Sequence, residues 1–103
     1  MGTWIKAASR EALARHSPLE AEAGRTAVLL YDIEGTVYAT AAVCPHHAAW
    51  LSQGGVKGDL VDCPRHQGQF HIPTGRKTRG PQCADLRTYP ARVEDGAIWV
   101  EVG

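Results

Sequence analysis

The sequence predicts a mainly β protein. Apolar and polar residues alternate with a period of two over most of the chain, and the alternating segments are rich in Val, Ile, Thr, Tyr and Trp. The 11 glycines and 6 prolines among the 103 residues supply the turns between these segments. The length is near the commonest size for one domain and no stretch resembles a linker, so we expect a single domain over residues 1–103.

The N-terminal half of the chain supplies a strand, a short helix and a hairpin. We expect the strand at residues 4–7, followed by a helical turn at 9–14 whose first residue, a serine, is a preferred N-cap. Two longer strands, 26–33 and 36–43, flank the dipeptide Glu34-Gly35. A two-residue connection of this kind is typical of a tight β-hairpin.

The middle of the chain, about residues 44–81, has a different composition. It holds more than half of the glycines, four of the five histidines and only short apolar pieces such as Leu60-Val61. We therefore expect an insertion built from loops. So long a loop segment in so small a domain needs an agent that orders it, and a metal centre would serve.

The strand pattern returns near the C-terminus and completes the β framework. Residues 87–93 and 97–102 both alternate, and the turn-forming sequence Glu94-Asp95-Gly96 lies between them. These residues predict a second tight hairpin.

Composition and charge exclude several classes of function. The 11 Lys and Arg residues balance the 11 Asp and Glu residues, which is unlike the basic surface of a nucleic-acid-binding protein. No stretch approaches the roughly 20 apolar residues that cross a membrane, and residues 1–14 lack the pattern of an export signal. We therefore expect a cytoplasmic protein with no nucleic-acid or membrane partner. Its three cysteines cannot all pair with one another, so we expect thiolate ligands rather than disulfides.

Two short motifs carry the candidate metal ligands. The first pairs Cys44 with His46 and the second pairs Cys63 with His66, with 16 residues between His46 and Cys63. Two thiolates and two imidazoles from two loops can hold iron or zinc. The order C-x-H then C-x-x-H differs from that of zinc fingers, where both cysteines come first. A zinc-bound interaction module stays open as an alternative, which the absence of visible absorbance would identify.

The motifs resemble those of Rieske ferredoxins. That family has C-x-H, a gap of similar size, C-P-x-H-x-G-x-F and a T-G turn, which here are CPH at 44–46, CPRHQGQF at 63–70 and Thr74-Gly75. The resemblance covers most of the chain and is closest to the ferredoxin components of bacterial aromatic-ring-hydroxylating dioxygenases. Further matching positions are Leu51-Ser52, Gly54, Gly58, Pro81, Tyr89-Pro90 and 93–96.

The resemblance implies a fold and a cofactor. The fold would be a Rieske-type antiparallel β-sandwich with a loop-built cluster-binding subdomain, and the cofactor one [2Fe–2S] cluster per chain. By resemblance, Cys44 and Cys63 would hold the buried ferric iron, while His46 and His66 would hold the outer, reducible iron. No residue would be catalytic.

The resemblance also implies a role in electron transfer. The chain would be a monomeric one-electron carrier between an NAD(P)H-dependent flavoprotein ferredoxin reductase and a terminal Rieske ring-hydroxylating oxygenase. It would transform no substrate itself. The alternative is a small Rieske subunit of a permanent reductase complex, as in some nitrite reductases.

The residues around the motifs predict a low reduction potential for the family. Respiratory-chain Rieske proteins add a disulfide between their loops and hydroxyl groups near the sulfurs, and the matching positions here hold Ala49, Arg65, Gly68 and Phe70. None of these supplies such contacts, so the reduced, more negative cluster is less stabilised.

Four further residues near the motifs need an interpretation. His47 stands where the family usually has Gly, but the spacing favours His46 as the ligand. We interpret His71 as a strand residue with no metal role and Cys83 as a small buried side chain. Trp50 lies near the cluster loops and could shield them.

The segment 57–79 is basic although the chain as a whole is neutral. It contains two aspartates and five basic residues, namely Lys57, Arg65, Arg76, Lys77 and Arg79. These residues could form a docking face that steers an acidic partner, or an ordinary solvated surface, and the sequence leaves both readings open.

Overall fold

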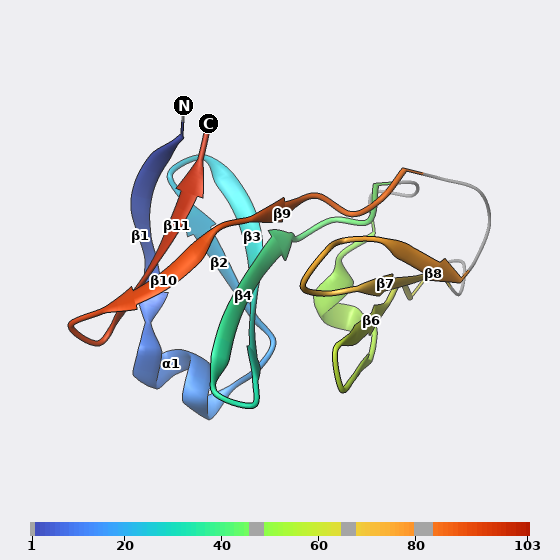
Figure 1. Cartoon of the computed structure of the whole chain (residues 1–103), viewed down its shortest axis with the longest axis horizontal. Coiled ribbons are helices and arrows are strands. Elements are labelled where there is room, and N and C mark those ends of the chain that lie inside the picture. Colours follow the sequence, from blue (N-terminus) through green and yellow to red (C-terminus); the bar gives the residue numbers. More distant parts are fainter. Residues whose placement is uncertain (1, 46–48, 65–67, 80–83) are drawn as a thin grey trace.

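The described residues form three antiparallel sheets arranged as successive layers (Figure 1). The structure is a computed structural model that describes residues 2–45, 49–64, 68–79 and 84–103. The outer sheet has the order β1-β11-β10, with strands at Thr3–Ser9, Ala97–Val102 and Ala91–Glu94. The central sheet has the order β2-β3-β4-β9, with strands at Leu19–Ala23, Thr26–Ile33, Thr36–Ala41 and Thr88–Tyr89. The small sheet has the order β5-β6-β7-β8, with strands at Val56–Lys57, Leu60–Asp62, Gln69–His71 and Lys77–Arg79.

Strand β3 is buried on both faces and separates two cores. Its residues Val28, Leu29, Leu30 and Tyr31 are all buried, which explains their continuous apolar run. Because successive strand residues point to opposite faces, Val28 and Leu30 enter one core while Leu29 and Tyr31 enter the other. The central sheet is therefore the layer that both halves of the molecule share.

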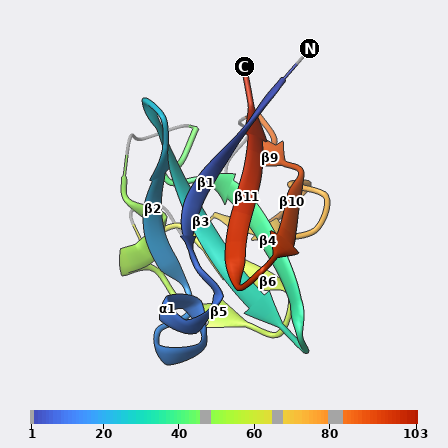
Figure 2. The same cartoon turned by 90° about the vertical axis from the view of Figure 1, so that its left-hand side faces the viewer.

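The first core lies between the outer and central sheets, which face each other in Figure 2. Ile98 and Val100 of β11 pack there with Val28 and Leu30 of β3. Helix α1, Arg10–Arg15, adds the fully buried Leu13. This arrangement confirms the predicted antiparallel β-sandwich.

The predicted helix and both hairpins are present. The Ser9 hydroxyl accepts a hydrogen bond from the Ala12 N–H at 3.0 Å, which makes Ser9 the N-cap of α1. The β3–β4 turn has positive φ at Glu34 (51°) and Gly35 (88°). The β10–β11 turn repeats this pattern at Asp95 and Gly96. Both turns have the type I′ sign pattern, whose twist matches that of the flanking strands.

The predicted strand 87–93 was wrong as a single element. Strand β9 pairs with β4 of the central sheet, whereas β10 pairs with β11 of the outer sheet. The chain changes sheets at Pro90, which has no N–H to donate to a ladder. The Pro90 carbonyl still accepts a hydrogen bond from the Glu101 N–H at 3.0 Å, so the crossing remains tied to the outer sheet.

Strand β2 is an element that the sequence reading did not include. It pairs antiparallel with β3 along its whole length, from Leu19 opposite Leu30 to Ala23 opposite Thr26. Its sequence LEAEA alternates apolar and charged residues with a period of two. That signal was present in the chain but is short and rich in residues that disfavour strands.

The prediction of loops alone for residues 44–81 was incomplete. This region also contains the 3-10 helix η1, Leu51–Gln53, and the four short strands of the small sheet. Val61, Phe70 and Leu51 are fully buried and pack against the second face of β3. The loops are therefore built on a small sheet that a second core fastens to the sandwich. No helix among the described residues is long and apolar enough to span a membrane.

Candidate metal centre

The two candidate cysteines begin two loops that are closed in the same way. The Cys44 N–H donates to the Ala49 carbonyl at 2.8 Å, and the Cys63 N–H donates to the Gly68 carbonyl at 2.7 Å. In each case the acceptor lies five residues after the cysteine. The chain thus presents two matched loops, 44–49 and 63–68.

Paired backbone segments support the base of each loop. Val43 forms a β-bridge with Trp50 at the first loop, and Asp62 pairs with Gln69 of strand β7 at the second. The backbone pairing therefore holds both ends of each loop in place. This architecture suits ligands that must be held in place before a cofactor binds.

Both cysteine side chains lie in the same buried cluster. Each is 2% exposed, and the cluster that contains them also includes Leu51, Phe70 and Leu86. Soft thiolate donors in water-excluded, apolar surroundings fit an iron–sulfur centre, because thiolates favour such metals and a low dielectric strengthens the interaction. Cys44 and Cys63, the two predicted ligands that the structure describes, are therefore compatible with a [2Fe–2S] cluster.

The predicted histidine ligands lie outside the described residues. His46 falls within loop 44–49 and His66 within loop 63–68, and His47 and Arg65 share these stretches. Pro81 and Cys83 also lie outside the described part. Within residues 2–45, 49–64, 68–79 and 84–103, no group of three or more His, Cys, Asp and Glu side chains gathers in one place.

Two glycines allow the small sheet to pack closely around the loops. A side chain at Gly54 would collide with the carbonyl oxygen of Asp62, the residue before Cys63. A side chain at Gly75 would collide with the carbonyl oxygen of Leu86, and Gly75 also has a φ of 78°. Both positions need glycine because backbone approaches backbone there.

His71 is held by two protein partners, as its place in strand β7 allows. Its Nδ1 lies 2.8 Å from the Thr74 hydroxyl oxygen, and its Nε2 lies 2.9 Å from a carboxylate oxygen of Asp59. These contacts join the β5–β6 turn to the turn that follows β7. The prediction that His71 is a strand residue is confirmed, and the structure gives its ring a local structural role.

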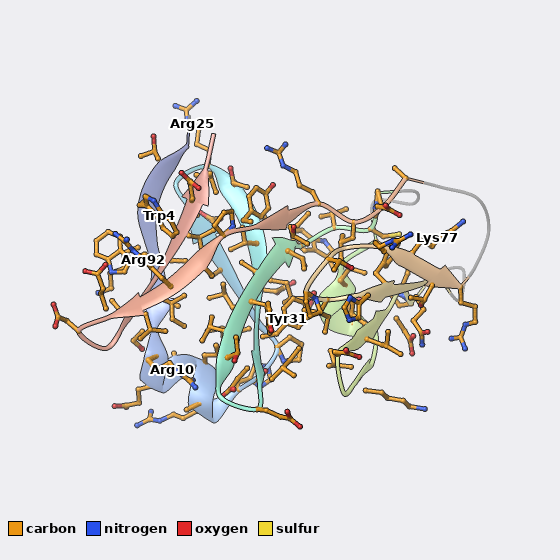
Figure 3. All side chains as sticks on the ribbon, in the orientation of Figure 1. Trp4, Arg10, Arg25, Tyr31, Lys77 and Arg92 are labelled. Atoms are coloured by element: carbon orange, nitrogen blue, oxygen red, sulfur yellow. The ribbon has the colours of Figure 1, made fainter. Side chains whose placement is uncertain are left out.

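The surface around the centre combines one exposed aromatic residue with several cations. Trp50, next to the first loop in the sequence, is 44% exposed, and its role in shielding the loops stays a prediction. Lys57, Arg76 and Arg79 are exposed on the small sheet, and Figure 3 shows Lys77 in the same half of the molecule. Arg79 approaches Asp62 at 3.6 Å.

Among the described residues, the clear pKa shifts belong to Tyr31 and Asp32 of strand β3. Burial raises the pKa of Tyr31 well above its ordinary value, and its hydrogen bond with Thr40 opposes this only in part. The Thr40 hydroxyl donates to the Ala41 carbonyl, so the Tyr31 hydroxyl is the donor in the 2.8 Å bond between the two side chains. Tyr31 therefore stays protonated as a structural hydrogen-bond donor.

Sequence reasoning missed the side chains that cross-link the base of the second loop. Gln69 Nε2 donates to Asp62 Oδ1 at 3.1 Å, and the Thr78 hydroxyl donates to Gln69 Oε1 at 2.9 Å. Gln69 fills an unspecified position of the C-P-x-H-x-G-x-F motif, and Asp62 precedes it. The motif alone therefore gives no signal that these residues meet.

Comparison with known proteins identifies the family. The model of the Rieske [2Fe-2S] domain matches residues 3–90. The ferredoxin component of the naphthalene 1,2-dioxygenase/salicylate 5-hydroxylase systems of Ralstonia sp is 32% identical over 99 residues, which are 96% of this chain and 95% of that protein.

Solved structures give the same result. The Sphingomonas yanoikuyae B1 ferredoxin has a TM-score of 0.89 and 26% identity, over 98% of this chain and 100% of that one. A chain in the complex of reduced oxygenase and oxidized ferredoxin in carbazole 1,9a-dioxygenase has a TM-score of 0.81 and 27% identity, over 95% of this chain and 92% of that one. The predictions of a [2Fe–2S] cofactor and of an electron-carrying ferredoxin that is not an enzyme are confirmed. This chain belongs to the Rieske [2Fe–2S] domain family.

Proposed function

We propose that this chain is the ferredoxin of an aromatic-ring-hydroxylating system. It would take single electrons from an NAD(P)H-dependent flavoprotein reductase and deliver them to a terminal Rieske oxygenase. The observation that carries the proposal is the pair of buried cysteines, Cys44 and Cys63, at the starts of two loops with matched closing hydrogen bonds. The dioxygenase ferredoxin from Ralstonia sp and the ferredoxin–oxygenase complex of carbazole 1,9a-dioxygenase support the choice of partners.

The proposed ligands are Cys44 and Cys63 for one iron and His46 and His66 for the other. Each histidine lies two or three residues after its cysteine and before the residue that closes the loop, so each loop supplies one thiolate and one imidazole. Two neutral imidazoles in place of two thiolates make the cluster less negative and easier to reduce.

The side chains around the second core support a potential at the low end of the Rieske range. Ala49 and Phe70 are buried and have no hydrogen-bonding group, and Gly68 has no side chain. With little side-chain hydrogen bonding at these positions, the reduced cluster gains little extra stability. The range spans roughly −150 to +300 mV, and we expect a value below about +150 mV.

The proposed carrier is a monomeric cytoplasmic protein with one domain. A reducing compartment keeps the thiols available as ligands. Contacts with both partners would be brief and small in area, as is usual for redox encounters.

The test is electron paramagnetic resonance of the dithionite-reduced protein together with its visible absorbance. We expect a rhombic signal with an average g value below that of all-cysteine [2Fe–2S] ferredoxins. A colourless, zinc-containing protein would contradict the proposal.

A second experiment tests the partners. The purified chain is mixed with a dioxygenase-system reductase and NADH, and bleaching of the cluster is followed with and without the terminal oxygenase. We expect reduction by the reductase and reoxidation by the substrate-loaded oxygenase. A chain that elutes only as part of a stable complex with a reductase subunit would favour the alternative of a permanent subunit.

A further inference from the structure

The second loop is cross-linked at its base by polar side chains. Asp62 immediately precedes the loop and Gln69 immediately follows it, and their side chains are joined by a hydrogen bond of 3.1 Å. Thr78 of strand β8 extends the network, because its hydroxyl lies 2.9 Å from Gln69 Oε1 and 3.2 Å from the Gln69 carbonyl oxygen. These hydrogen bonds connect three neighbouring strands, β6, β7 and β8, at the base of loop 63–68.

The first loop has a different support at the corresponding positions. Val43 and Trp50 flank it, and their pairing is a single β-bridge rather than part of a continuous ladder. The Val43 side chain has no hydrogen-bonding group and that of Trp50 has only one N–H donor. The two side chains therefore cannot form a bond like that between Asp62 and Gln69. The two loops are therefore closed by matching backbone bonds but fixed by different side-chain chemistry.

Asp62 places a carboxylate one residue away from a proposed ligand. Its side chain is 30% exposed, and its cation, Arg79, is 60% exposed and 3.6 Å away. Ion pairs this exposed are weak, so Arg79 offsets only part of the negative charge. A nearby negative charge disfavours the added electron of a reduced cluster.

We propose that Asp62 and Gln69 are positioning residues for the second ligand loop, and that the Asp62 charge also lowers the reduction potential of the cluster. The inference rests on the proposed function, because it takes Cys63 as a ligand. The network would have two separable effects. The Asp62–Gln69 bond would hold the loop in position, and the Asp62 charge would lower the reduction potential.

Three variants separate the two effects. Asp62→Asn keeps an oxygen that can accept from Gln69 but removes the charge. Gln69→Leu keeps the charge but removes the bond, and Asp62→Ala removes both. The readouts are the midpoint potential, the g values of the reduced protein and the rate at which a chelator bleaches the cluster.

The expected results differ for each variant. Asp62→Asn should raise the midpoint potential and leave the g values and the bleaching rate unchanged. Gln69→Leu loses the side-chain bonds to both Asp62 and Thr78, and since one hydrogen bond corresponds to about a fivefold factor, it should bleach at least about fivefold faster, with altered g values. Asp62→Ala should show both a higher potential and faster bleaching.

Asp59→Asn is the matched charge control. It removes the same charge from the same small sheet, but Asp59 lies at the other end of β6, about 10 Å along the strand from Asp62. We expect a clearly smaller shift in potential than for Asp62→Asn. Equal shifts in both variants would overturn the charge assignment, and a bleaching rate of Gln69→Leu equal to that of the wild type would overturn the positioning assignment.

The wild-type spectrum keeps this inference distinct from the proposed function. If the wild-type protein lacks the Rieske signal, the proposed function fails. If the wild type has the signal and the variants behave like it, only the role of the Asp62–Gln69 network fails.

Discussion

At the residue scale, Cys63 contributes both a backbone hydrogen bond and the side chain of a proposed ligand. Its N–H closes the second loop and its side chain is buried in the core that also holds Cys44. If Cys63 is a ligand, as we propose, a serine in this place retains the backbone bond but replaces the thiolate with a hydroxyl group, which is a poor ligand for an iron–sulfur cluster. A substitution at this position therefore tests metal binding without removing the backbone bond that closes the loop.

We predict that Cys63→Ser will be colourless. The cluster cannot easily replace a lost ligand, and the coupling of metal binding to folding implies lower stability as well. Visible absorbance and iron content after purification measure the effect. The control is His47→Gly, which should keep the cluster because the spacing favours His46. A cluster retained in Cys63→Ser, or lost in His47→Gly, would change the ligand assignment.

Asp32 gives a second prediction at this scale. A hydrogen bond from Arg10 and another from the Gly35 N–H, each 2.9 Å long, lower the pKa of its carboxyl group. Because the pKa is lower in the folded state than in the unfolded chain, the carboxylate adds stability at neutral pH. That stability is lost as the pH falls through the folded-state pKa, which lies below the ordinary pKa of an aspartate.

The variant Asp32→Asn tests this linkage. We expect it to lower the free energy of unfolding by about 1 kcal/mol at pH 7, with a difference from the wild type that shrinks below about pH 4. Urea unfolding of both proteins between pH 7 and pH 3 measures the difference. A difference that stays constant over this range would show that the charge of Asp32 has no part in it.

At the scale of elements, the small sheet depends on close approach of its backbone segments. Gly54 meets the Asp62 carbonyl with an ordinary negative φ, Gly58 has a φ of 59° in open space, and Gly75 combines a positive φ with a backbone contact at Leu86. Replacing each of the three glycines in turn therefore distinguishes the effect of steric collision from that of backbone strain.

We predict a ranking for their replacement by alanine. Gly58→Ala should cost about 1 kcal/mol from its left-handed backbone, and Gly54→Ala about 1 to 3 kcal/mol from overpacking. Gly75→Ala should cost about as much as both together. Thermal unfolding of the holoproteins gives the order. A Gly58→Ala variant less stable than Gly75→Ala would contradict the close contact with Leu86.

At the scale of the whole molecule, charge is distributed unevenly although it sums to zero. Of the exposed cations, Lys57 lies in β5 of the small sheet that supports the loops, and Arg76 immediately precedes β8 of the same sheet. Figure 3 shows Arg25 at the opposite end of the molecule from Lys77. The principal extents of 40, 29 and 18 Å are several Debye lengths at physiological salt, so a partner at the loops experiences mainly the local charge.

We predict that electron transfer to the partner will slow as salt is added. If the basic residues form a docking face, screening weakens their attraction for an acidic surface. Stopped-flow rates at low and high ionic strength measure this. Lys57→Gln and Arg76→Gln should slow the low-salt reaction several-fold, whereas the distant Arg25→Gln should not. Equal effects of all three would favour an ordinary solvated surface.

The sequence by itself determined the features that depend on neighbouring residues. The Ser9 cap, the two hairpin turns and the C-x-H and C-x-x-H motifs are local, because each is set by residues a few positions apart. For the same reason the motifs indicated the family and its cofactor before any contact was known. The ligand set itself stays a prediction, since His46 and His66 lie outside the described residues.

The tertiary structure decided which strands pair, in which register and in which sheet. Strand β2 forms because it pairs with the edge of β3. The predicted strand 87–93 is interrupted at Pro90 because β9 pairs with the central sheet and β10 with the outer sheet. The bond between Asp62 and Gln69 exists only because β6 and β7 pair in one register. Such pairings depend on which strand faces are buried when the sheets pack on one another, and no local pattern of residues specifies that packing.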